Sequence, residues 1–354
     1  RGIGVYYTNL TVGRISFAVI EDRKFKTGPE AVLPEMDCRP NRPDHVSVPD
    51  YDPRILDVPE ATLLGERQLK FLGHWAADWR DCDMKAVLSQ TVFCGGAHLH
   101  GSRNNRLYAD LDSNGWPQSG RNAALKEIRK AFALMIAGDQ HLGTIIHHGV
   151  NDWNDSGYSL CVPSIANLYL RWWVPLEPGR NREPGAPEYT GEFLDGFANK
   201  ITMLAVANPS PEENHDKLTT RAAGFGVVRF NKKTREITLE CWPRNVDITA
   251  PQTKQYPGWP RTLDQQDNYG RKPVAFLPTI EVQGMTNPVV QVIDESNGEI
   301  IYTLRINGTS YSPKVFKKEK YTVKVGQQGT DKMKILSGIE PLAAGETRTI
   351  NVIF

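Results

Sequence analysis

The feature that most constrains this chain is an apolar run that leads directly into polar, chemically active residues. Residues 134–137 are apolar, Gly138, Asp139 and His141 follow at once, and a second apolar run comes next. This pattern predicts a buried strand, and ligands of open α/β sheets lie at the carboxyl edge of such strands. An extended backbone would direct Asp139 and His141, two residues apart, to the same side. Because an oxygen and a nitrogen ligand suit a metal cation, we predict that both bind metal. The alternative is a turn in which His141 is an ordinary hydrogen-bonded residue.

Two further polar groups precede this run. His98 and His100 lie two residues apart in a glycine-rich loop after an apolar run at 84–93, so they could supply metal ligands or phosphate contacts. Two solvent-facing histidines are the alternative. Asp112 and Asn114 belong to a polar turn. They could be oxygen donors near a metal, or simply turn formers.

Helical periodicity occurs twice in the first half of the chain. Residues 64–79 place Leu72, Ala76 and Trp79 on one apolar stripe, and residues 120–130 form a second periodic segment that leads into the run at 134–137. Arg121 falls in the first turn of this second helix, where the helix dipole disfavours a cation, so we expect an anion or carboxylate beside it. A strand, a loop, a helix and a strand in this order predict an α/β layer unit.

Length and charge narrow the class of protein. A chain of 354 residues favours two domains, and a net charge of +1 predicts no strong attraction to nucleic acid or anionic membranes. No apolar run approaches membrane-spanning length and no signal peptide is visible. The chain opens at Arg1 without a methionine, which suggests a longer natural polypeptide or a trimmed one. Five scattered cysteines contain no Cys-x-x-Cys pair, so a zinc finger is not expected, while one or two disulfides remain possible.

The pattern of apolar and polar residues changes after an irregular, proline- and glycine-containing stretch at 247–271. From residue 274 onward, short alternating apolar runs are separated by turn residues, among them the hairpin signal Asn297-Gly298. About eighty residues with this spacing fit an immunoglobulin-like β-sandwich. We therefore expect an α/β unit over 1–270 and an accessory all-β domain over 271–354 that serves packing or attachment.

Four short motifs, taken in order, resemble the C-terminal half of the alkaline phosphatase D-like metallophosphoesterases. The motifs are Tyr6-Tyr7-(x5)-Gly13 leading into Glu21-Asp22-Arg23, Leu64-Gly65-(x2)-Gln68 leading into Trp75 and Trp79, Asp112-Ser113-Asn114-Gly115-Trp116-(x4)-Arg121, and Gly138-Asp139-Gln140-His141. The resemblance covers the chain up to about residue 270.

The resemblance implies a four-layer α/β/β/α phosphoesterase fold, export to the periplasm, cell surface or exterior, and a centre of two or more metal ions (iron, calcium, zinc or manganese). It implies metal binding at Asp139 and His141, and catalytic, substrate-side positions for Asp112, Asn114 and Arg121. His98 and His100 have no counterpart in it and stay weaker metal candidates. The family's early motifs, which supply most of the ligands, have no match here. An N-terminal segment or separate chain is therefore expected to carry them.

Two functions of different classes follow. The complete protein is expected to hydrolyse phosphate monoesters or diesters, with this chain supplying the Gly-Asp-x-His half of the site. The alternative is a catalytically inactive structural or adhesive protein that retains a phosphatase-like scaffold. Intact aspartate and histidine motifs upstream would favour the enzyme, and their absence would favour the scaffold.

Overall fold

The computed structural model describes residues 6–166, 169–210 and 220–354 and is centred on a mixed sheet of eight strands. In spatial order these are β1 (Thr8–Val12), β2 (Ile15–Val19), β5 (Met84–Thr91), β8 (Leu134–Gly138), β10 (Tyr158–Cys161), β9 (Thr144–His148), β13 (Lys200–Val206) and β12 (Gly191–Leu194). The neighbours β2, β5, β8 and β10 run parallel, and the other pairs are antiparallel. The strand expected at 134–137 is confirmed as β8.

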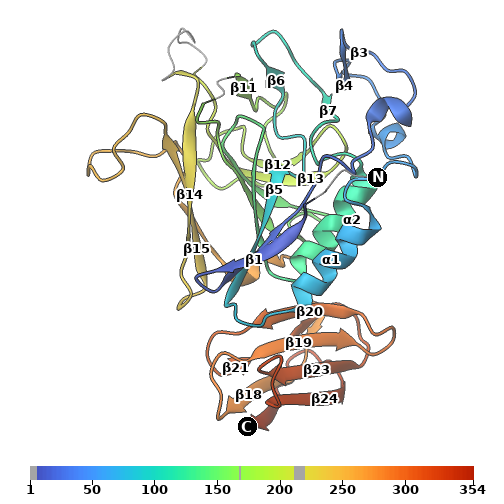
Figure 1. Cartoon of the computed structure of the whole chain (residues 1–354), viewed down its shortest axis with the longest axis vertical. Helices are drawn as coiled ribbons and strands as arrows, with labels where there is room; N and C mark the ends of the chain where they lie inside the picture. Colours follow the sequence, from blue (N-terminus) through green and yellow to red (C-terminus); the bar gives the residue numbers. More distant parts are fainter. Residues whose placement is uncertain (1–5, 167–168, 211–219) are drawn as a thin grey trace.

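Two α-helices cover one face of this sheet. Helices α1 (Gly65–Ala77) and α2 (Gln118–Arg129) lie side by side (Figure 1) and share a core with β2, β5 and β8. The predicted stripe is confirmed, because Leu72 and Ala76 are buried in this core and Trp79 is buried just beyond the helix end. Short 3₁₀ helices lie at η1 (Pro29–Ala31), η2 (Pro53–Leu56) and η4 (Gln265–Asn268).

A second sheet covers the opposite face. It contains β14 (Gly224–Phe230), β15 (Glu236–Pro243) and β16 (Arg261–Asp264), and its apolar side packs on the central sheet. The described residues therefore form three layers, α/β/β, in which both α-helices lie on the first face. The four-layer arrangement stays a prediction.

The C-terminal segment is all-β, as expected. One sheet is β20-β19-β23-β24 (Ile300–Arg305, Val289–Asp294, Tyr321–Gly326, Met333–Ile339), a second is β21-β18-β25 (Ser310–Tyr311, Thr279–Gln283, Thr349–Ile353), and β17 pairs with β22 (Ala275–Phe276, Lys314–Val315). The hairpin at Asn297-Gly298 is confirmed between β19 and β20. One apolar core joins these sheets to Trp79, Cys82 and Phe132 of the preceding segment. The division at residue 270 and the immunoglobulin-like description stay interpretations.

Short strands lie at the end of the molecule away from the C-terminal sheets (Figure 1). They form β3-β4-β7 (Cys38–Arg39, Arg42–Val46, Ala109–Asp110) and β6-β11 (Leu99–His100, Arg171–Trp172). Strand β5 begins two residues after Cys82, which contacts the C-terminal sheets, so its carboxyl end lies at the opposite end. The carboxyl edge of the parallel strands therefore faces these short strands. All five cysteines are free, so the possible disulfides do not form.

Candidate functional site

Arg23 occupies the centre of the carboxyl edge. It follows β2, and its guanidinium pairs with two carboxylates from other loops: Nη1 with Asp112 Oδ1, and Nη2 with Asp139 Oδ2 at 2.7 Å. Nη1 also donates to the carbonyl of Asp112 at 2.9 Å. Burial disfavours the charged guanidinium, but Asp112, Asp139 and Asp22 outweigh that effect and raise the pKa of Arg23. A permanent cation thus links two of the predicted site residues.

A buried network lies beneath this ion pair. Asp22, which is 1% exposed, accepts hydrogen bonds from the amide of Asn114, the hydroxyl of Ser89 (2.8 Å) and the backbone N–H of Thr91 (3.2 Å). The Asn114 amide nitrogen also donates to Ser89 and Thr91, so this predicted residue ties the turn after β7 to the end of β5. Asn114 is therefore buried and positions the residues of the site, and it does not face solvent.

Lys26 closes one side of the same edge. Its ammonium donates to the carbonyls of Asp112 at 2.9 Å and Ser113 at 2.6 Å and lies over the ring of Trp116. Burial lowers the pKa of Lys26 to about 8, against the opposing effect of Asp112. The edge consequently holds two basic groups, Arg23 and Lys26, next to exposed carboxylate oxygen of Asp112, whose side chain is 47% exposed.

Asp139 and His141 do not lie on an extended backbone. Strand β8 ends at Gly138, and the two residues have φ of 64° and 52°, in the left-handed region. The premise that an extended chain directs both to one side is wrong, because the chain turns as soon as the glycine is passed. The Asp139 carboxylate faces Arg23, whereas Nδ1 of His141 lies 3.2 Å from the carbonyl oxygen of Tyr169.

His141 nevertheless has the surroundings of a metal ligand. If Nδ1 donates to the Tyr169 carbonyl, Nε2 is the nitrogen that carries the lone pair, which is the arrangement common around metal-bound histidine. Burial lowers the pKa of His141 and so favours the neutral imidazole that binds metals. Within the described residues, however, Asp139 and His141 gather no third histidine, cysteine or carboxylate ligand. The metal assignment of this pair stays a prediction.

Arg121 is not on the substrate side, which corrects its predicted catalytic role. Its side chain is 1% exposed, and it donates to the backbone carbonyls of Phe93 at 2.9 Å and Gly149 at 2.7 Å. Among the described residues, the carboxylate expected beside Arg121 is not one of its hydrogen-bond partners; Asp57 instead accepts from the backbone N–H of Ser119 at 2.9 Å. Arg121 instead holds the helix against the ends of β5 and β9.

The two predicted histidines separate. His98 stacks on Trp173 with ring centroids 4.0 Å apart, and burial lowers its pKa to about 3. His100 joins His45 and Asp110 in a buried group whose ligand atoms all lie within 4.8 Å of one another. Within the described ranges this is the sole set of three such residues close enough to share one metal ion. His98 therefore packs against an aromatic side chain. His100, in contrast, lies next to two further residues of metal-ligand type, His45 and Asp110.

The sequence interpretation missed most of these partners. Arg23 appears in the sequence only as the last residue of the Glu21-Asp22-Arg23 motif, and neither Lys26 nor His45 belongs to any of the motifs or periodic segments. Asp110 precedes the predicted Asp112 by two residues and turns inward, 4% exposed. Arg171 joins the two groups, because it lies 3.1 Å from Gln140 Oε1 and 3.4 Å from Asp110 Oδ2.

Comparison with known proteins gives little further guidance. No protein-family model matches the sequence, and no curated protein matches it. A solved structure described as "Structure of PhoD" aligns with 97% of this chain and 45% of its own, at a TM-score of 0.42 and 12% sequence identity. The chain thus spans less than half the length of that protein. A similarity of this degree assigns neither fold nor function. No helix in the described part of the chain is long and apolar enough to cross a membrane.

Proposed function

We propose that the chain supplies part of the active site of an exported, metal-dependent phosphoric ester hydrolase, at the carboxyl edge of β2, β5 and β8. The observation that carries the proposal is Arg23, a guanidinium shared between Asp112 and Asp139 at the edge where α/β sheets bind ligands. The substrate is a phosphate monoester or diester.

The basic groups would bind the phosphate. A guanidinium offers parallel donors that match two oxygens of a phosphoryl group, and charge-assisted bonds of this kind are the strong ones. When substrate binds, Arg23 can exchange its bond to partly exposed Asp112 for a phosphate oxygen and keep its bond to Asp139. Lys26 would then add a second positive charge beside the same oxygens.

Asp139 and His141 would hold metal through a carboxylate oxygen and through Nε2 of the imidazole. A bound metal would activate water and neutralise charge on the phosphate. The two residues fit the role of ligands but do not complete a site, since an ion needs four or more ligands. The proposal therefore requires an N-terminal segment or partner chain that carries the remaining ligands, as the motif resemblance implies.

One observation favours the second candidate function, a structural or adhesive protein on a phosphatase-like scaffold. The Asp139 carboxylate is already neutralised by Arg23 at 2.7 Å, and no third ligand gathers there among the described residues. An edge whose charges satisfy one another is stable without a ligand. The two candidate functions make different predictions for the complete protein with metal bound: the first hydrolyses a phosphate ester and the second does not.

The test is hydrolysis of p-nitrophenyl phosphate and bis(p-nitrophenyl) phosphate by protein carrying its upstream segment, with each candidate metal added. We expect Asp139→Asn to abolish measurable turnover and Arg23→Met to lower kcat/KM about 10- to 100-fold, the equivalent of a lost charged hydrogen bond. Asp331→Asn, at an exposed position in the C-terminal sheets, should leave the rate unchanged. Equal rates for Asp139→Asn and the unaltered protein, or no turnover with any metal, would contradict the proposal.

A further inference from the structure

His45, His100 and Asp110 come together from two small sheets above the proposed active site. His45 on β4 pairs directly with Asp110 on β7, and His100 lies at the end of β6. Nε2 of His45 lies 3.8 Å from Oδ1 of Asp110, and the two imidazole rings are 5.3 Å apart, nearly edge to face. The three side chains are between 0% and 4% exposed.

The His100 imidazole lacks the partners that a buried ring normally has. Neither ring nitrogen makes a hydrogen bond of normal geometry within the described residues, although the backbone of Ala97 lies close enough to favour the protonated form. Buried polar groups are nearly always hydrogen-bonded, so each exception needs a physical reason. A lone pair directed at a cation is such a reason.

We propose that His45, His100 and Asp110 form a binding site for one late first-row divalent cation, of the class of zinc, iron(II) or cobalt(II), distinct from Asp139 and His141. Two imidazole nitrogens and one carboxylate oxygen are the ligand types these ions favour. With bonds of about 2.1 Å, ligand atoms on one ion lie roughly 3–4 Å apart. A group already within 4.8 Å needs only a small contraction to reach that spacing.

The protonation states of the two imidazoles agree with this assignment, whereas burial raises the pKa of the Asp110 carboxyl, which must be ionised to bind a cation. Burial is the main cause that lowers the pKa of His45 to about 4, with Arg42 and Arg39 adding to it against Asp44. Burial also lowers the pKa of His100, helped by Arg171, His45 and Arg39. Both rings are therefore neutral near pH 7, in the form that coordinates metal.

Three arginines face the histidine and carboxylate atoms of this group. Arg39 Nη1 lies 3.4 Å from Nδ1 of His45, and Arg42 and Arg171 each have a second partner to retain. Arg42 Nη2 lies 2.6 Å from Nε2 of His45, but its guanidinium also pairs with Asp44 through bonds of 2.6 and 3.0 Å. Arg171 lies 3.4 Å from Asp110 and keeps Gln140 at 3.1 Å. If either Arg42 or Arg171 moves away from the ligand atom, its guanidinium still has its second partner. The cation and Arg42 thus compete for the same nitrogen.

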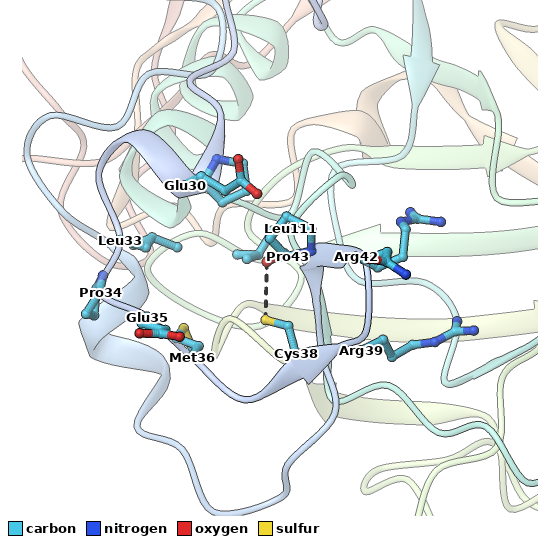
Figure 2. Close-up of a pocket in the computed structure, with 12 residues that line it drawn as sticks. Glu30, Leu33, Pro34, Glu35, Met36, Cys38, Arg39, Arg42, Pro43 and Leu111 are labelled. Atoms are coloured by element: carbon cyan, nitrogen blue, oxygen red, sulfur yellow. Dashed lines mark hydrogen bonds between the residues drawn. The ribbon is translucent and has the colours of Figure 1, made fainter.

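A cavity lies next to the β3–β4 hairpin that carries Arg39 and Arg42. Its volume is about 530 Å³, and its lining includes Arg39, Arg42 and Leu111, the residue after Asp110. Figure 2 shows Arg39 and Arg42 extending from the β3–β4 hairpin to the side away from Cys38. Since the Arg42 side chain is 47% exposed, its guanidinium can swing aside without breaking the core.

The test uses the chain as it is, with cobalt(II) absorption spectra and zinc(II) calorimetry, and does not depend on phosphatase activity. We expect one ion per chain at this group, with affinity at least tenfold weaker in His100→Asn and in Asp110→Asn. His74→Asn, at an exposed histidine on α1, should bind as the unaltered chain does. Asp139→Asn should also bind normally here, so loss of phosphatase activity and loss of this site are separable.

A variant that binds the metal more tightly separates loss of a metal ligand from loss of the native fold. Arg42→Met removes the competing guanidinium and should tighten cobalt binding, which a misfolded protein cannot do. The proposal is overturned if Arg42→Met leaves affinity unchanged, if His100→Asn binds as tightly as the unaltered chain, or if Asp139→Asn abolishes the binding instead. It is also overturned if inorganic phosphate raises the unfolding temperature as much as zinc does and His100→Asn abolishes that rise, because the group would then be an anion site separate from Arg23 and Lys26.

Discussion

Arg305 connects the C-terminal sheets to the rest of the chain, so replacing it tests how much this connection contributes to stability. Its side chain is 5% exposed, and it donates to the backbone carbonyls of Cys82 at 2.7 Å, Trp79 at 2.8 Å and Asn287 at 3.0 Å. The first two carbonyls belong to the α/β segment and the third to the segment of the C-terminal sheets. One buried cation therefore satisfies acceptors on both sides of the junction.

The change Arg305→Met keeps the apolar stem and removes every one of these donors. A hydrogen bond to a charged group contributes about 1.5–3 kcal/mol, and bonds that share one side chain are not additive. We therefore expect a loss of about 3–5 kcal/mol in the free energy of unfolding, the range for breaking a buried charged partnership. With a urea m-value of about 3 kcal/mol/M or more, the midpoint should fall by roughly 1 M.

The assay is urea unfolding followed by circular dichroism, with Arg348→Met as the control. Arg348 is an exposed arginine in the loop directly before β25, and such surface changes usually stay within about 0.5 kcal/mol. If Arg305→Met moved the midpoint no more than Arg348→Met does, the inference that Arg305 holds the two segments together would be refuted.

Two further predictions concern the interior of the α/β segment. Gly115→Ala should destabilise the protein by about 1–3 kcal/mol, because its Cβ would lie 2.7 Å from a ring carbon of Phe197; Gly28→Ala, with nothing within 4 Å, should be neutral in the same thermal melts. Burial lowers the pKa of His147 to about 4, so the unfolded state takes up its proton first and stability must fall as pH drops from about 6.5 to 4. His147→Gln should reduce that slope by up to about 1.4 kcal/mol per pH unit, and identical slopes for both proteins in pH-dependent urea titrations would contradict it.

Local patterns in the sequence determined the elements of this fold. The apolar run before Gly138 became the buried strand β8, and the stripe that contains Leu72 and Ala76 became the buried face of α1. The Asn297-Gly298 signal became a hairpin of the C-terminal sheets. These features follow from the periods of helix and strand and from turn chemistry, which depend on neighbours along the chain.

Only the tertiary structure decided which side chains meet. Arg23 pairs with Asp112, 89 residues away, and with Asp139, 116 residues away. The backbone turn at Asp139 and the burial of Arg121 likewise came from packing rather than from local preference. Strand order and loop closure bring such residues together, and neither leaves a periodic trace. The sequence therefore located the edge of the sheet where polar residues collect, while the pairing of strands selected Arg23 as its centre and joined His100 to His45 and Asp110.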